Sequence, residues 1–307
     1  MLLFLLLTCC TLNHLERGVL FAVMDSYRPP ASSQPPQGRP FGLRLSSLPH
    51  HPHNHTALTP VSFLLRGALI HPHKLALTHP ERSWQLTYSQ WAARCLSLAF
   101  ALRTCVPGWK KGDRVAIITP NAPLILDAYH GVLAAGGVVV PINIRNIKSE
   151  VDYVLEHSGA TVVLVDHEMK HLVDAAPGTS SASSSSTRRT IIVSNDSGGQ
   201  DPSDAYEAFL QRGRQAWDEA QRAEDSRHPE GQALLDWELL ETVEETDMAA
   251  ICYTSGTTGR PKGVVTNHRG SYLAAVANAV EAGLGYDSVY NWTLPCFHAL
   301  GEYAVLD

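Results

Sequence analysis

The chain has 307 residues, a formal net charge of −6, and a composition that is 44% hydrophobic and 18% charged. This length accommodates one large α/β domain or two smaller ones, and the composition is ordinary for a soluble protein with a substantial core. The negative charge argues against nucleic acid, and against an anionic membrane, as the main partner. The six cysteines show no C-x-x-C or metal-ligand spacing, which indicates reduced, scattered thiols.

The composition of the N-terminal region predicts little folded structure. Residues 1–12, MLLFLLLTCCTL, form a hydrophobic segment that is shorter than the roughly 20 residues needed to span a bilayer. No Lys or Arg precedes it and no clear small-residue cleavage site follows it, so we expect no stable membrane insertion, while a secretory signal stays open as the alternative. The following stretch is rich in Pro, Ser and His. We therefore expect residues 1–57 to be a disordered leader and residues 58–307 to form the folded part.

A capping box, Thr87-x-x-Gln90, predicts the start of the first clear helix. The apolar residues that follow recur at helical spacing and form one stripe: Trp91, Cys95, Leu98 and Leu102. We expect this stripe to be core and to carry no chemistry.

Three short apolar runs then alternate with two helical segments. The runs RVAIIT, VVVPIN and TVVLVD are typical of strands buried on both faces of a sheet. Between them lie APLILDAYHGVLAA, which we predict to be capped by Asn121 and ended at Gly136-Gly137, and KSEVDYVLEHS. This order predicts a βαβαβ unit whose strands, near 114–119, 138–142 and 161–165, are parallel neighbours.

Beyond Asp166 the alternation lapses into a low-complexity surface insertion, residues 176–189, whose small polar residues cannot offset the entropy of ordering. The run TIIVSN resumes the sheet, and residues 203–227 predict a helix with one apolar side: Tyr206, Phe209, Leu210 and Trp217. MAAICYTS is then a buried strand. Altogether the pattern predicts an α/β fold with doubly wound, mostly parallel sheets and flanking helices.

That last strand leads into a loop rich in glycine and hydroxyl residues, CYTSGTTGRPKGVV, from Cys252 to Val265. Such a loop exposes several N–H and hydroxyl donors to one small volume, its glycines allow close approach to an anion, and Lys262 adds a mobile positive charge. The P-loop pattern G-x-x-x-x-G-K-[ST] does not fit, because Gly263 follows Lys262. The alternative of a plain polar turn is disfavoured by the density of these residues, so we predict a phosphate-binding loop.

The stretch YTSGTTGRPKGVV resembles the signature loop of the AMP-forming acyl-CoA synthetase family, which are adenylate-forming, AMP-binding enzymes. Four further segments resemble family sequences in the same order: LTYSQWA, GDRVAIITPNAP, GVLAAGGVVVPIN and TLPCFHALG. The resemblance covers residues 58–307 and implies a partial AMP-binding domain, the N-terminal portion of such an enzyme.

The resemblance implies that a carboxylic acid reacts with ATP and Mg²⁺ to give an acyl-adenylate, which coenzyme A, the co-substrate, then captures. The residues implied to hold the ATP phosphates are Thr254, Ser255, Gly256, Thr257, Thr258, Gly259 and Lys262. A hydroxyl of Thr257 or Thr258 is implied to lie near Mg²⁺, and Lys262 and His298 are implied to be catalytic. His298 matches the histidine of the family's P-x-F-H segment, near the acyl pocket; a packed histidine at a strand end is the alternative.

Some expected family segments lie outside this sequence: an acidic Mg²⁺ ligand, a ribose-binding aspartate and a C-terminal domain with a catalytic lysine. We therefore expect a truncated form that is inactive alone, from a ligase for a fatty acid in the cytoplasm, with the peroxisome or mitochondrion as alternatives. Two other functions stay open. One is an adenylation domain that passes its acyl group to a carrier protein, and the other is a non-catalytic remnant that binds a nucleotide or a partner.

Overall fold

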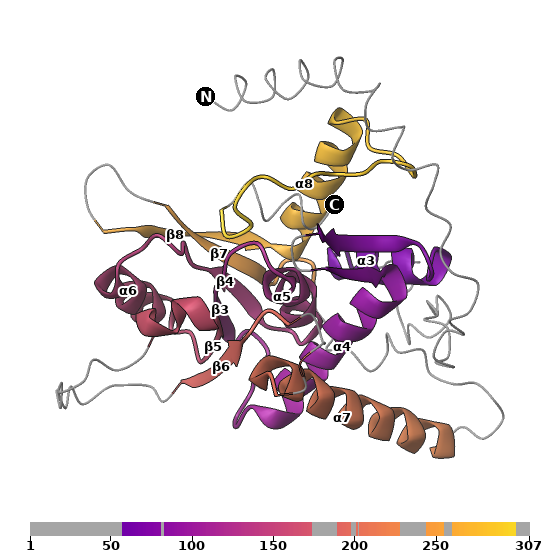
Figure 1. Ribbon diagram of the computed structural model, residues 1–307, viewed down its shortest axis with the longest axis horizontal. Coiled ribbons are helices and arrows are strands. Elements are labelled where there is room, and N and C mark those ends of the chain that lie inside the picture. The colour runs from indigo at the N-terminus through magenta and orange to yellow at the C-terminus, as the bar shows by residue number, and fades with distance from the viewer. Residues whose placement is uncertain are drawn as a thin grey trace.

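The computed structural model describes residues 57–80, 83–173, 189–197, 201, 203–227, 244–254 and 260–298 (Figure 1). The predicted leader, residues 1–57, lies outside these ranges except for Ala57, and the predicted insertion, residues 176–189, except for Arg189, so both stay predictions. None of the helices in the described ranges combines the length and the apolar character that crossing a bilayer demands.

The centre of the fold is a six-stranded sheet with the strand order β6-β5-β3-β4-β7-β8. Its strands are β3 (Arg114–Ile118), β4 (Val138–Pro141), β5 (Val162–Asp166), β6 (Thr190–Ser194), β7 (Met248–Thr254) and β8 (Lys262–Asn267). β3 pairs in parallel with both β4 and β5, which confirms the predicted βαβαβ unit. β5 with β6 and β4 with β7 are also parallel. Only β7 with β8 is antiparallel among these pairs, and β8 was not predicted as a strand.

Helices cover both faces of this sheet (Figure 1). They are α3 (Val61–Ile70), α4 (Tyr88–Cys105), α5 (Pro123–Ala134), α6 (Lys148–Ser158), α7 (Ala205–Arg227) and α8 (His268–Glu281), with the short 3₁₀ helix η2 (His167–Leu172). A separate antiparallel hairpin joins β1 (Leu75–His79) to β2 (Trp84–Thr87). This hairpin and α3 were not predicted from the sequence.

The sheet divides the apolar interior into two cores because side chains alternate along each strand. In β3, Val115 and Ile117 join the core that contains α4, α5 and α7. Ala116 and Ile118 join the core on the other face, beneath α6. Each Val or Ile buried in this way contributes about 1.5–3 kcal/mol relative to exposure. The continuous apolar runs in the sequence therefore reflect burial on both faces, as predicted.

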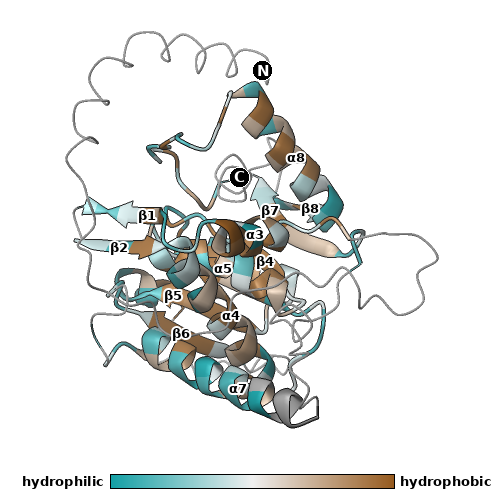
Figure 2. Ribbon diagram, turned by 90° about the vertical axis from the view of Figure 1, so that its right-hand side faces the viewer, coloured by the Kyte–Doolittle hydropathy of each residue, from teal (hydrophilic) through white to brown (hydrophobic). Residues whose placement is uncertain are grey.

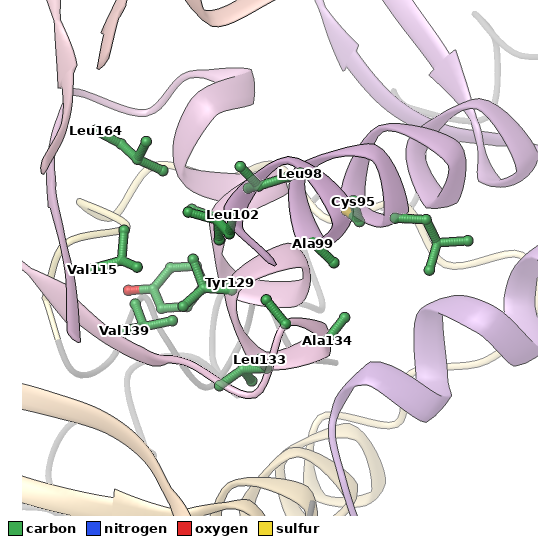
Figure 3. Close-up of a cluster of buried hydrophobic side chains, with 14 of the residues drawn as sticks. Cys95, Leu98, Ala99, Leu102, Val115, Tyr129, Leu133, Ala134, Val139 and Leu164 are labelled. Atoms are coloured by element: carbon green, nitrogen blue, oxygen red, sulfur yellow. The ribbon is translucent and has the colours of Figure 1, made fainter. Parts of the chain in front are cut away.

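Tyr129 lies at the centre of the larger core. Figure 3 shows its ring beside Val115 and Val139 of the sheet, with side chains of α4 arranged above it. The predicted stripe of α4 is buried in this core: Trp91, Cys95, Leu98 and Leu102. Likewise the predicted apolar side of α7 is buried: Tyr206, Phe209, Leu210 and Trp217.

The predicted caps had different outcomes. The Thr87–Gln90 capping box is present, with the Gln90 N–H donating to Thr87 Oγ1 at 3.3 Å and the Thr87 N–H donating to Gln90 Oε1 at 2.8 Å. The prediction that Asn121 caps α5 was wrong. The N-cap position is Ala122, which makes no side-chain cap, and a proline occupies the first turn. The Asn121 side chain is used by a distant segment instead.

Candidate functional site

The predicted phosphate-binding loop connects β7 to β8, and the structure describes both of its ends. Thr254, the last residue of β7, pairs across the hairpin with Lys262, the first residue of β8. Both side chains are exposed. The intervening predicted ligands lie outside the described residues: Ser255, Gly256, Thr257, Thr258 and Gly259. Of the seven predicted phosphate ligands, the structure thus places Thr254 and Lys262, side by side at the mouth of the hairpin.

The hairpin opens at the carboxyl edge of the parallel strands. β7 runs parallel to β4, with Ala250 opposite Val139, so Thr254 leaves the sheet at the same edge as the end of β4. Open α/β sheets bind their ligands at this edge. Lys262 forms no ion pair with any residue in the described part of the chain, so its ammonium group is available to an anion such as a phosphate.

The residue after Lys262 is fixed as glycine by packing. A Cβ atom added at Gly263 would lie 2.8 Å from Ile251 Cγ2 and 3.4 Å from Tyr253 Cζ. A serine or threonine, which a P-loop would require here, would crowd these two side chains of β7. The departure from the P-loop pattern therefore has a local steric cause.

Helix α6 packs against one face of the hairpin mouth. The Tyr153 hydroxyl donates to the carbonyl oxygen of Pro261 at 3.2 Å. His157 Nδ1 is hydrogen-bonded to the Tyr253 hydroxyl at 2.7 Å. Partial burial, and secondarily the neighbouring Tyr153, raises the pKa of Tyr253 above its ordinary value. The Arg260 guanidinium lies 5.4 Å from the Tyr153 ring centroid, within cation–π range.

The segment that carries His298 is held at the same edge of the sheet. The Asn121 amide donates to the Leu294 carbonyl at 2.8 Å and accepts from the Cys296 N–H at 2.8 Å. The Tyr129 hydroxyl donates to the Cys296 carbonyl at 2.7 Å. The loop between β3 and α5, through Asn121, and the interior of α5, through Tyr129, thus fix the backbone that leads to His298.

His298 itself is exposed, and its N–H closes a turn by donating to the Pro295 carbonyl at 3.1 Å. The predicted catalytic role of His298 and its alternative, a packed histidine, both stay predictions. Within the described ranges, no hydrogen bond or ion pair joins His298 to Thr254 or Lys262. Cys296 is only 2% exposed, and burial raises the pKa of its thiol to about 12, which matches a packing role and not a nucleophilic one.

The resemblance to the family implies a Mg²⁺ ion beside the same hairpin. The predicted Mg²⁺ neighbours Thr257 and Thr258 lie outside the described residues. Among those described, no group of three or more His, Cys, Asp or Glu side chains is arranged to hold a metal ion. Thr254, at the described mouth of the hairpin, is exposed and carries a hydroxyl oxygen of the kind that binds Mg²⁺.

Sequence reasoning missed the residues that support the site. Tyr153 and His157 are separated by four positions in a predicted helix, a spacing that places them on one face. That spacing was readable, but their partners on the hairpin were not. Asn121 gave a misleading signal, because an Asn before a helical segment ordinarily indicates a cap.

Comparisons with known proteins give the family of the chain. The family model described as AMP-binding enzyme matches residues 66–306. An acetate–CoA ligase from Humulus lupulus is 35% identical over 265 residues, covering 85% of this chain and 44% of the relative. A peroxisomal acetate/butyrate–CoA ligase from Arabidopsis thaliana is 35% identical over 259 residues, covering 84% of this chain and 43% of the relative.

The solved structures show a shared fold. The N-terminal domain of FACL13 from Mycobacterium tuberculosis matches with a TM-score of 0.60 and 26% identity, covering 81% of this chain and 54% of that one. ATP-bound MatB from Rhodopseudomonas palustris shares the fold, with a TM-score of 0.61 at 22% identity, and is covered over 42% of its length. The chain spans less than half the length of the curated relatives it matches. On the family match and these identities, the chain belongs to the AMP-binding enzyme family, as its signature loop predicted.

Proposed function

We propose that the protein is an AMP-forming acyl-CoA ligase and that the β7–β8 hairpin holds the phosphates of its ATP. The observation that carries the proposal is the position of Lys262. This lysine is exposed, forms no ion pair with a described residue, and lies opposite Thr254 at the carboxyl edge of the parallel strands. Membership of the family, and relatives named as CoA ligases, support the same activity.

In the proposed reaction, a carboxylate oxygen attacks the α-phosphorus of ATP, the bond to the β-phosphate breaks, and pyrophosphate leaves. Negative charge therefore grows on the departing pyrophosphate. Lys262 and the N–H and hydroxyl donors of the loop, Thr254 to Gly259, would stabilise that charge. Mg²⁺, near Thr257 or Thr258, would neutralise phosphate charge when it is bound. Coenzyme A then displaces AMP from the acyl-adenylate through its thiol.

His298 is proposed to act at the other reactant. Its exposed imidazole follows a backbone segment fixed by Asn121 and Tyr129, so it can orient the incoming carboxylate. We propose a short-chain fatty acid as the substrate, because two relatives are named for acetate or butyrate. The proposed compartment is the cytoplasm or, as for the relatives whose names include it, the peroxisome.

The 307-residue polypeptide assayed by itself is expected to lack this activity. The relatives that it matches are more than twice as long as the matched part. If the reaction needs groups from the whole length of these relatives, the matched part alone cannot bring those groups together.

The experiment joins residues 57–298 to the remaining length of the Humulus lupulus acetate–CoA ligase, in place of the aligned segment. Acetate-dependent exchange of labelled pyrophosphate into ATP is measured for this fusion. Lys262→Ala should slow exchange by about ten- to a thousandfold, the scale of removing one preorganised donor. Lys110→Ala is the matched control, because this exposed lysine precedes β3 at the opposite edge of the sheet.

Two outcomes would count against the proposal. One is a folded fusion, verified by its melting transition, that binds ATP without acid-dependent exchange, as expected of a non-catalytic remnant. The other is an equal effect of Lys262→Ala and Lys110→Ala, which would remove Lys262 from the reaction.

A further inference from the structure

Two side chains of α6 touch the hairpin on either side of its proposed phosphate-binding end. Tyr153 and His157 are four residues apart, so they lie on one face of the helix, and their ring centroids are 5.3 Å apart. The residues that α6 buries are different ones: Val151, Val154, Leu155 and Ser158. Tyr153 and His157 are therefore a second contact surface of the helix, directed at the hairpin.

The first contact fixes the strand that begins with Lys262. The Tyr153 hydroxyl donates to the Pro261 carbonyl at 3.2 Å, and this carbonyl belongs to the peptide group that Pro261 shares with Lys262. Because a peptide group is planar, a hydrogen bond to its oxygen also restricts the orientation of the Lys262 N–H. The direction in which the Lys262 side chain leaves the backbone is restricted in turn.

The second contact fixes the opposite strand. His157 Nδ1 is hydrogen-bonded to the Tyr253 hydroxyl at 2.7 Å, and the two rings meet edge to face with centroids 5.7 Å apart. Tyr253 immediately precedes Thr254 and pairs with Gly263. The two contacts of α6 therefore reach both strands within one residue of the Thr254–Lys262 pair.

Strand geometry leaves Lys262 on the side of the hairpin that α6 does not cover. Side chains alternate between the two faces of a strand, and Tyr253 is packed against the core beneath α6. Thr254 and Lys262, each one residue away from the Tyr253–Gly263 pair, project from the other face. Helix α6 thus supports the hairpin from behind and leaves the ammonium group of Lys262 exposed.

We propose that Tyr153 and His157 are positioning residues that hold Lys262 for the polyphosphate end of ATP. This role rests on the proposed function of the hairpin, and neither residue is assigned contact with the nucleotide. A donor that is already oriented needs no rearrangement when negative charge develops. Two tethers on one rigid helix supply that orientation from an element outside the hairpin.

The test measures binding of inorganic tripolyphosphate to the 307-residue chain by calorimetric titration at constant ionic strength. Tyr153→Phe keeps the ring and removes the hydroxyl, His157→Phe replaces the imidazole with an aromatic ring that has no hydrogen-bonding atoms, and Lys262→Ala removes the proposed charge. Tyr272→Phe is the matched control, since it deletes a hydroxyl from a ring that stacks on Phe63 in another part of the molecule, with centroids 4.4 Å apart. Melting temperatures are recorded for every variant.

The expected result is an increase in Kd of about fivefold for Tyr153→Phe and for His157→Phe, the equivalent of one lost hydrogen bond. Lys262→Ala should weaken binding at least tenfold, and Tyr272→Phe should match the parent. A role in stability alone would lower the melting temperature and leave Kd unchanged. Tyr253→Phe removes the same His157 contact from the hairpin side, so it serves as the second variant if one substitution in α6 prevents folding.

The outcomes distinguish a failure of the positioning role from a failure of the proposed function of the hairpin. If the parent chain shows no saturable binding, or Lys262→Ala binds equally well, the proposed function of the hairpin fails and the positioning role fails with it. If Lys262→Ala weakens binding but Tyr153→Phe, His157→Phe and Tyr253→Phe all match the parent, only the positioning role is overturned.

Discussion

Gly263 illustrates how one residue determines which phosphate-binding pattern the chain can use. A Cβ atom there would lie 2.8 Å from Ile251 Cγ2, so even alanine is overpacked. We expect Gly263→Ala to reduce the free energy of unfolding by about 1 kcal/mol or more. The measurement is urea denaturation.

The matched control for that substitution is Gly285→Ala. A Cβ atom at Gly285 meets nothing within 4 Å, and its backbone is not in the left-handed region. Alanine there should be neutral, or stabilising by up to about 1 kcal/mol, because it lowers the entropy of the unfolded chain. Equal effects of the two substitutions would contradict the steric account of Gly263.

Asn121 marks the limit of local sequence reasoning. Its position before a helical segment indicates an N-cap, yet its amide bonds to Leu294 and Cys296, more than 170 residues away in the chain. These two long-range hydrogen bonds replace the local hydrogen bond that an N-cap would make. The residues next to Asn121 in the sequence do not reveal these distant partners.

At the scale of elements, the contact of α4 with α7 depends on a glycine. A Cβ atom at Gly213 of α7 would lie 1.9 Å from the Ser97 carbonyl oxygen and 2.7 Å from the Ala101 nitrogen. The backbones of the two helices are therefore in direct contact at this point, and a rigid backbone cannot yield as a flexible side chain can.

We expect Gly213→Ala to destabilise the fold by about 1–2 kcal/mol. Alanine gains about 1 kcal/mol over glycine in helix propensity, so the substitution would stabilise α7 if packing were unimportant. Overpacking, about 1–3 kcal/mol and occasionally more, has to exceed that gain. Chemical denaturation of Gly213→Ala, with Gln215→Ala at an exposed neighbouring position as control, decides the sign. A stabilised Gly213→Ala protein would mean that the two helices do not approach this closely.

An ion-pair cluster joins three helices across the same interface. Arg94 of α4 donates to Asp127 of α5 at 2.9 Å and to both carboxylate oxygens of Glu207 of α7 at 2.8 and 3.0 Å. The Tyr206 hydroxyl also donates to Asp127 at 3.1 Å. The three charged residues of this cluster did not stand out in the sequence, because a charged residue in an amphipathic helix ordinarily indicates an exposed face.

Whether a strand could be predicted depends on whether its own residues carry a recognisable pattern. The strands of the βαβαβ unit were readable because burial on both faces makes each one a continuous apolar run. β8 was not, since its exposed Val264 and Val265 follow a loop whose glycines and lysine dominate the local pattern. Its antiparallel direction is a property of the hairpin and not of the strand sequence.

At the scale of the whole molecule, two buried groups should give opposite contributions to the pH dependence of stability. Burial, which outweighs the neighbouring Arg94, raises the pKa of the fully buried Asp127 to about 6 from 3.8. Burial lowers the pKa of His268 to about 4 from 6.5, in a site where Nδ1 contacts Thr59 Oγ1 at 2.9 Å.

The two signs follow from proton linkage. As pH rises from about 4 to 6, the unfolded chain has lost the Asp127 proton that the folded chain keeps, so this group destabilises the fold increasingly. Over about the same interval the unfolded chain binds a proton on His268 that the folded chain lacks, so stability from this group rises with pH. Each slope approaches about 1.4 kcal/mol per pH unit, and the two largely cancel.

Substitution should separate these contributions. Between pH 4 and 6, the free energy of unfolding of Asp127→Asn, taken relative to that of the parent chain, should increase with pH. The free energy of unfolding of His268→Asn, taken in the same way, should decrease with pH. Urea denaturation at several pH values measures the slopes, which are compared independently of any change in absolute stability. Parallel profiles for the parent and both variants would show that neither group has the shifted pKa.

The sequence identified the family more readily than it described the surface of the fold. Figure 2 shows hydrophobic residues along α8, where Leu273, Val276 and Val280 are exposed. The signature loop identifies the family because its residues must act together at one place. An exposed helix face carries no such constraint, and its role depends on contacts that a local pattern does not encode.

The most direct test of the central claim is calorimetric titration of the 307-residue chain with ATP and Mg²⁺, repeated with Lys262→Ala. The account predicts saturable binding that inorganic tripolyphosphate displaces and that Lys262→Ala weakens by about tenfold or more, the effect of losing one charge-assisted contact. Absence of binding by the folded parent chain, or ATP binding unaffected by tripolyphosphate and by Lys262→Ala, would contradict the claim that the β7–β8 hairpin holds the phosphates.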